Sequence, residues 1–289
     1  MKLVTFSRRG RTSIGKVVGN AVIDLPASDR TLPSSMRELL NGGAELLDRA
    51  RKLDVERAAS YPLSDVRLEA PIPDPSKYLA IGMNYRKHVA EAEKLGLKVP
   101  DSQVWFNKQV SCINGPFDSV HMPKVSDKLD YEAELGVVIG KRCRHVSARD
   151  ARSVIAGYTV CNDVSVRDWQ QRSPTMMLGK SFNTTGPIGP WIVTDDEVVD
   201  PHALSMRMLI NGVEKQAAVT GEMIFNIYEQ IAYLSTVMTL EPGDLLATGT
   251  PSGVGVAMDP PQFLSVGDVM RVEIDGIGAI ENVVIAEPV

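Results

Sequence analysis

Three carboxylates near the middle of the chain have a spacing that suits divalent-metal chemistry. Glu132 and Glu134 lie two residues apart at the start of an apolar run, and the strand period of two places both on one face. Asp163 follows a second apolar run, 157–162. Three converging carboxylates form an all-oxygen site, which favours Mg²⁺ or Mn²⁺, and less obviously Ca²⁺, over zinc. The alternative is a solvated edge strand whose acids prevent aggregation.

A histidine and a glutamate earlier in the chain have the spacing of an acid–base pair. His88 and Glu91 lie in a segment that predicts a helix from Asn84 to Leu95, with Asn84 as its N-cap. Residues at i and i+3 share a helix face. A carboxylate beside an imidazole raises its basicity and fixes its tautomer, so the pair can take a proton from water. An exposed helix with an incidental His–Glu pair has the same pattern.

Longer motifs around these residues resemble those of the fumarylacetoacetate hydrolase family. The resemblance runs in order over about residues 71–284 and is carried by DYEAELGVVIG (130–140), GYTVCNDVSVRDWQ (157–170), LGKSF (178–182) and GDLLATGTPSGVG (243–255). It implies that the metal ligands are Glu132, Glu134 and Asp163. It also implies that His88 and Glu91 form a water-activating dyad on a lid, and that a mixed β-roll catalytic domain pairs into a homodimer.

The same resemblance assigns further residues to the site. Lys180, which by residue type alone is expected at the surface, becomes a second positive centre for a metal-bound oxyanion. Thr250 offers a hydroxyl to a substrate carboxylate. At position 83 the chain has methionine where several members of the family have arginine. The predicted substrate-binding residues are Gln170, Thr250, Tyr85 and Arg86.

The activity implied by the resemblance is hydrolysis of a carbon–carbon bond in a 2,4-dioxo acid, in aromatic or sugar acid catabolism. His88, helped by Glu91, would activate water, and the metal and Lys180 would hold the expelled enolate. The alternative is oxaloacetate decarboxylation or keto–enol tautomerisation, because these reactions use the same enolate. A catalytically silent metal-binding protein is a third hypothesis, and the presence of both the His–Glu pair and Lys180 argues against it.

The elements that must position these residues predict a strand-dominated α+β fold. Residues 1–70 are expected to form a small N-terminal α/β domain, whose helix over 36–53 is broken at Gly42-Gly43. A proline-rich connector at 70–75 places the boundary to the catalytic domain, 71–289, near residue 71. Asn211-Gly212 predicts a hairpin, and a helix is expected over 223–238. Buried strands are predicted at 78–81, 135–139, 157–161, 206–210, 245–248, 269–274 and 278–284.

Composition limits the partners. The chain has 289 residues and a formal net charge of −5, so no global basic field attracts nucleic acid or an anionic membrane. Three cysteines without a C-x-x-C pair favour free thiols over disulfides or structural zinc. The N-terminus lacks the apolar core of a signal peptide, and no run reaches the length of a membrane span. A soluble, cytoplasmic enzyme is therefore expected.

Overall fold

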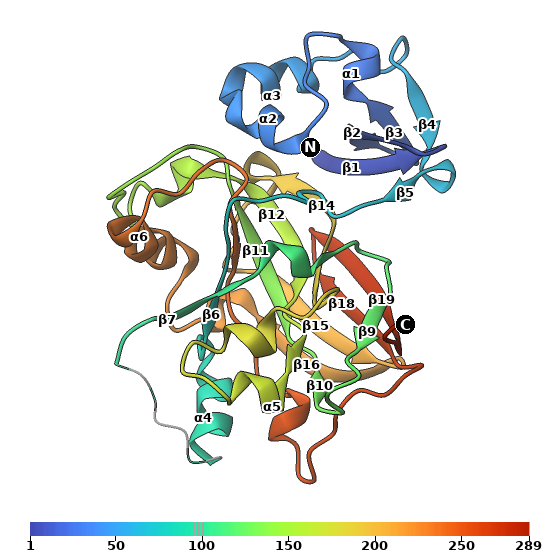
Figure 1. Cartoon of the computed structure of the whole chain (residues 1–289). Coiled ribbons are helices and arrows are strands. Elements are labelled where there is room, and N and C mark those ends of the chain that lie inside the picture. Colours follow the sequence, from blue (N-terminus) through green and yellow to red (C-terminus); the bar gives the residue numbers. More distant parts are fainter. Residues whose placement is uncertain (95, 97–98, 100, 289) are drawn as a thin grey trace.

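The computed structural model describes residues 1–94, 96, 99 and 101–288, and it has the expected strand-dominated α+β fold (Figure 1). The N-terminal part forms a small unit of strands covered by short helices. Its helices break where predicted, because Gly43 has φ +61° and starts a new helix directly after Gly42. The elements are β1 (Lys2–Arg8), β2 (Arg11–Val18), β3 (Ala21–Asp24), α1 (Leu25–Ser28), α2 (Met36–Asn41), α3 (Gly43–Arg51), β4 (Ser60–Pro62) and β5 (Arg67–Leu68).

One large sheet connects the N-terminal unit to the rest of the chain. Its order is β4-β3-β2-β1-β14-β12-β11-β17-β6-β7, so β1 joins the larger part by antiparallel pairing with β14. Because the sheet is continuous across this seam, the boundary near residue 71 stays a prediction. The strands of the larger part are β6 (Tyr78–Gly82), β7 (Val104–Lys108), β11 (Ala133–Ile139), β12 (Ile155–Asn162), β14 (Gly186–Thr194) and β17 (Leu245–Ala247).

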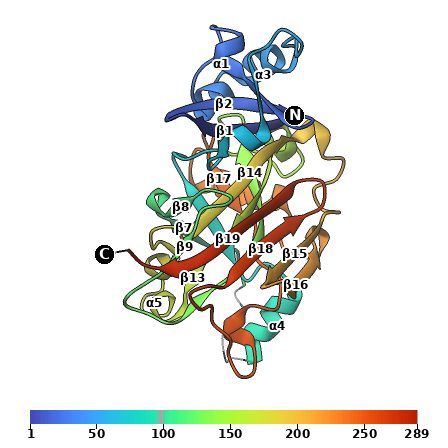
Figure 2. The same ribbon diagram turned by 90° about the vertical axis from the view of Figure 1, so that its right-hand side faces the viewer.

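A second sheet packs against the first and encloses the main core (Figure 2). Its order is β16-β15-β18-β19-β9, and the hairpin predicted at Asn211-Gly212 joins β15 to β16. Side chains such as Val137 of β11 and Val272 of β18 are fully buried between the sheets. Its strands are β9 (Val120–Met122), β15 (Ser205–Ile210), β16 (Val213–Val219), β18 (Val269–Ile274) and β19 (Gly278–Ala286). Outside this sheet, β8 (Ile113–Asn114) pairs with β14 of the first sheet, and β10 (Leu129–Asp130) pairs with β13 (Ser165–Val166) in a two-stranded sheet of their own.

Among the described residues, the larger part has three α-helices: α4 (Arg86–Lys94), α5 (Arg167–Gln170) and α6 (Ile227–Val237). The prediction that Asn84 caps α4 is wrong. Its fully buried side chain donates to the Thr248 carbonyl (2.8 Å) and accepts from the Phe225 amide (2.9 Å). Asn84 thus ties the start of α4 to the loops after β17 and before α6. Position 95, the expected helix end, lies outside the described residues.

The same contacts explain why α6 is shorter than predicted. The amides of Ile224 and Phe225 bond to Asn84, and the backbone on either side of them is extended, with ψ 139° at Met223 and 166° at Asn226. The helix starts only at its N-cap, Asn226, whose side chain forms a capping box with Glu229. Within the described part of the chain, no helix is long and apolar enough to cross a membrane.

Candidate active site

The three acids predicted as metal ligands lie together where β11 begins and β12 ends. Antiparallel pairing places Ala133 opposite Asn162, which brings Glu132 and Glu134 beside Asp163. Each acid offers a carboxylate oxygen, and these oxygens lie within 4.8 Å of one another. All three residues are buried, with exposed fractions of 5%, 1% and 0%. An edge strand that presents its acids to solvent is therefore not what these residues form.

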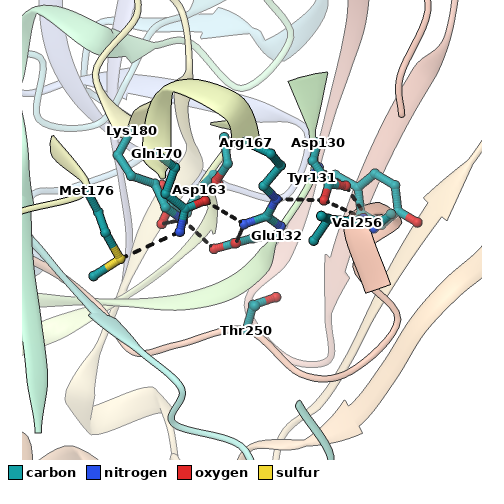
Figure 3. Close-up of polar contacts among 12 residues, drawn as sticks. Asp130, Tyr131, Glu132, Asp163, Arg167, Gln170, Met176, Lys180, Thr250 and Val256 are labelled. Atoms are coloured by element: carbon teal, nitrogen blue, oxygen red, sulfur yellow. Dashed lines mark hydrogen bonds and ion pairs between the residues drawn. The ribbon is translucent and has the colours of Figure 1, made fainter. Parts of the chain in front are cut away.

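Three cationic side chains surround the acids (Figure 3 shows two of them). The Lys180 ammonium bridges Glu132 (2.8 Å) and Asp163 (2.7 Å). Lys108, fully buried, lies 2.6 Å from the other oxygen of Asp163. The Arg167 guanidinium pairs with Glu132 at 2.6 Å and with Asp130 at 2.8 Å. Glu134 forms no ion pair with a described residue; its carboxylate accepts the Gly249 amide at 2.8 Å.

The charges of this cluster leave room for a divalent cation. Four buried carboxylates, including Asp130, face three buried cations, so the cluster lacks one positive charge. A divalent ion would reverse its sign and leave the site positive toward an anionic substrate. Burial raises the pKa of Glu134 well above its ordinary value, and repulsion from Asp163 and Glu132 adds to the effect. A buried acid without a cationic partner, beside two other carboxylates, fits a metal ligand.

Glu132 behaves differently because it already has cationic partners. Burial alone would raise its pKa, but Lys180 and Arg167 outweigh that effect and lower the pKa to about 2. Burial alone would lower the pKa of Lys180, but the carboxylates of Asp163 and Glu132 outweigh that effect and raise it. The lysine is therefore protonated at neutral pH and supplies a fixed positive charge inside the site.

Glu134 gives the metal-free protein a distinct pH dependence. A folded pKa above the unfolded value contributes stability below the unfolded pKa, near 4.5, and this stability is lost as pH rises through the folded pKa. In EDTA, the wild type should therefore lose unfolding free energy relative to Glu134→Gln as pH rises above about 4.5. Urea unfolding of both proteins over a pH series measures this difference. A difference that does not change with pH would contradict the assignment.

The His–Glu pair predicted on the lid is formed in α4. His88 Nδ1 lies 3.2 Å from a Glu91 oxygen, and the other Glu91 oxygen accepts the Gly253 amide at 2.9 Å. Glu91 thus orients the imidazole and fastens α4 to the loop after β17. Since Nδ1 faces Glu91, Nε2 is the ring nitrogen left for proton transfer.

A cavity of about 490 Å³ joins the dyad to the acidic cluster. Its described lining includes His88 and Glu91 of the dyad and, of the three clustered acids, Glu132; it also includes Arg167, Gln170, Lys180 and Thr250. Gln170 accepts from Arg167 at 3.0 Å, and the Thr250 hydroxyl accepts from Gln216 at 2.9 Å. A larger cavity, about 930 Å³, lies between β5 and the turn after β18. None of the three clustered acids and no residue of the His–Glu pair lines it, so we place the chemistry in the smaller one.

Two of the predicted substrate contacts do not lie in this cavity. Tyr85 is buried in the main core, where its backbone forms a bridge with Met223. Arg86 is exposed at the first turn of α4 and is absent from the cavity lining. α4 turns His88 and Glu91 toward the cavity, whereas Tyr85 and Arg86 are outside its described lining. That Tyr85 and Arg86 bind substrate stays a prediction.

Sequence reasoning missed two residues that hold the cluster together. Arg167 lies four residues after Asp163, in a short helix that directs its side chain back to the acids. Lys108 follows Phe106 at the strand period of two, and Phe106 is buried. A lysine on the buried face of a strand indicates a buried ion pair, and this pattern could have identified Lys108 from the sequence.

Comparison with known proteins defines the class of protein. The sequence model of the fumarylacetoacetate hydrolase C-terminal domain matches residues 77–285, and the chain belongs to this family. Oxaloacetate tautomerase fahd2 of Xenopus laevis, a mitochondrial protein, is 42% identical over 99% of this chain and 90% of its own length. The chain is thus an enzyme of this family, while the cytoplasmic location expected above stays a prediction and does not match that relative's location.

Two solved structures share the fold over nearly the whole chain. Fumarylacetoacetate hydrolase from Exiguobacterium antarcticum has a TM-score of 0.88 and 35% identity, covering 99% of this chain and 100% of its own. Maleylpyruvate hydrolase from Sphingobium, solved with manganese(II) and pyruvate, has a TM-score of 0.83 and 32% identity, covering 100% of both chains. The β-roll architecture expected from the resemblance is confirmed.

Proposed function

We propose that this enzyme interconverts the keto and enol forms of a 2-oxo acid, with Mg²⁺ or Mn²⁺ held by Glu132, Glu134 and Asp163. The observation that carries the proposal is that one cavity is lined by Lys180, by the His88–Glu91 pair and by Glu132, whose carboxylate lies beside those of Glu134 and Asp163. The name of the Xenopus relative supports tautomerisation over the hydrolysis that was the first expectation.

Each residue has a distinct task in this reaction. His88 Nε2 takes a proton from C3 of the substrate, and Glu91 stabilises the imidazolium that forms. Water then protonates the enolate oxygen to give the enol, and the imidazolium returns its proton to solvent. Lys180 directs its positive charge at the oxygen on which enolate charge develops. A bound divalent ion supplies further electrophilic stabilisation of that oxygen. Proton transfer requires no nucleophilic side chain, so the three free cysteines have no role in the proposed reaction.

Hydrolysis of a carbon–carbon bond is the second candidate. It is supported by the maleylpyruvate hydrolase, which shares the fold and was solved with manganese and pyruvate. In this reaction His88 would take its proton from water instead of C3. Labelled solvent oxygen in a product acid would identify hydrolysis, whereas deuterium exchange at C3 without cleavage identifies tautomerisation. The homodimer, and the absence of nucleic acid or membrane partners, stay predictions.

The dyad variants test the proposal. His88→Ala should lower the rate of C3 proton exchange by about 10²–10⁴-fold, because it removes the general base. Glu91→Gln should lower it less, since the imidazole remains. Exchange in D₂O, followed by NMR with Mn²⁺-free, Mg²⁺-loaded enzyme, is the measurement.

His121→Ala is the matched control for these variants. His121 lies half-buried on β9, outside the described cavity lining, so its loss should leave exchange unchanged. Wild-type exchange by His88→Ala would remove the dyad from the mechanism. A wild-type enzyme that cleaves 2,4-dioxo acids but exchanges no C3 proton would favour the hydrolase instead.

A further inference from the structure

One wall of the catalytic cavity is apolar, and its shape comes from the pairing of β6 with β7. Antiparallel register places Gly82 opposite Val104 and Ala80 opposite Phe106. Gly82, Val104 and Phe106 therefore share one face of the sheet. A Cβ on Gly82 would lie 3.9 Å from Phe106 Cε1 and 4.0 Å from Met176 Cε. Phe106 and the Met176 thioether thus close over the glycine and form a continuous hydrophobic surface.

Neighbouring residues extend this surface around the cavity. Met83 follows Gly82 with φ +56°, an uncommon backbone conformation for a residue other than glycine, and lines the cavity. Met176 has φ +57° and lines it as well. The other apolar residues of the described lining are Ile81, Ala92, Val104, Phe106, Val254, Val256 and Ala257.

The positively charged side chains of the described lining all lie beside the clustered acids. Arg167 and Lys180 are the cationic residues of that lining, and both are ion-paired with the clustered acids. Under the proposed function they face the 2-oxo carboxylate head of the substrate. The Lys180 ammonium lies 5.0 Å from the centre of the Phe106 ring, but it is already paired with Glu132 and Asp163. Toward Met83 and Val104 the wall offers no cation of the described lining to a second carboxylate, and burying an unpaired carboxylate against hydrocarbon is costly. About 490 Å³ is also within the range that holds ligands much larger than a four-carbon acid.

We propose that the substrate is a 2-oxo acid whose far end is uncharged and apolar, an alkyl or aryl group that packs on the wall formed by Met83, Val104, Phe106 and Met176. This inference rests on the proposed function and deepens it. The proposed substrate differs from oxaloacetate, which the name of the Xenopus relative gives, because oxaloacetate has a second carboxylate at its far end. Flexible, polarisable thioethers suit a wall that accepts apolar groups of varied shape.

A matched pair of compounds tests the inference. 2-Oxoglutarate and 5-methyl-2-oxohexanoate have the same number of non-hydrogen atoms, and they differ in a terminal carboxylate against an isopropyl group. This difference is separated from C3 by C4, and exchange in enzyme-free buffer corrects for the remaining difference in reactivity. We expect kcat/KM for C3 exchange to be at least about tenfold higher for 5-methyl-2-oxohexanoate. Calorimetric affinities for the Mg²⁺-loaded enzyme should follow the same order.

Two variants at position 83 identify the wall as the cause. Met83→Arg places a cation there and should shift the ratio of kcat/KM at least about tenfold toward 2-oxoglutarate. Met83→Leu, which has the same backbone requirement and no charge, should keep the apolar preference. Gly82→Ala adds a methyl group at ordinary contact distances, so it should fold and should slow the bulky apolar substrate more than pyruvate.

The outcomes distinguish this inference from the proposed function. Equal or better turnover of 2-oxoglutarate by the wild type, or an unchanged ratio in Met83→Arg, would overturn the apolar preference while leaving tautomerisation in place. Failure of every 2-oxo acid, pyruvate included, to exchange its C3 protons would overturn both.

Discussion

Removal of the divalent metal should lower C3 proton exchange by more than about 10³-fold. Without the ion, the buried acids outnumber the buried cations, and the cluster repels an anionic 2-oxo acid. Dialysis against EDTA, followed by titration with Mg²⁺ or Mn²⁺, measures the loss and its recovery. Circular dichroism before and after dialysis shows whether the fold persists without metal.

The acidic ligands themselves provide a second arm of this experiment. Glu134→Ala should weaken metal affinity, because it removes the one acid of the three that pairs with no described cation. Glu45→Gln is the matched control, since Glu45 is exposed in the first turn of α3. Full turnover by demonstrably metal-free enzyme would refute the metal assignment. Unchanged affinity in Glu134→Ala would remove this residue from the ligand set.

Lys180→Met should separate metal binding from catalysis. The ammonium lies 2.7–2.8 Å from Glu132 and Asp163, so it competes with the metal for the same carboxylates. Its loss should therefore leave Mn²⁺ affinity unchanged or higher. Exchange should still fall by about 10²–10³-fold, because the enolate oxygen loses a preorganised positive partner. Calorimetry with Mn²⁺ and NMR exchange rates with Mg²⁺ give the two readouts.

The design of the lysine experiment must account for stability. Without metal, the variant leaves buried carboxylates short of a partner and should unfold at lower temperature than the wild type. Saturating Mg²⁺ should recover much of that loss by binding the native state. Lys141→Met, at an exposed position, is the control. Mn²⁺ affinity that collapses in a folded Lys180→Met variant, or exchange at the wild-type rate, would contradict the role of the lysine.

The sequence by itself determined the features that depend on local spacing. The two-residue interval between Glu132 and Glu134 and the three-residue interval between His88 and Glu91 survive in the structure, because strand and helix periods are properties of short segments. The break at Gly42-Gly43 and the hairpin at Asn211-Gly212 were likewise predictable, since glycine marks both positions.

Only the tertiary structure decided which distant residues neutralise the acids and which form the substrate wall. Lys108 and Lys180 meet Asp163 from 55 and 17 residues away, and these contacts depend on how separate strands and loops pack. Asn84 likewise has the residue type and position of a helix cap, but its side chain bonds to the backbone of Thr248 and Phe225 and not to an amide of α4. Local propensity cannot anticipate such contacts, because a buried polar group takes the partners that the assembled fold supplies.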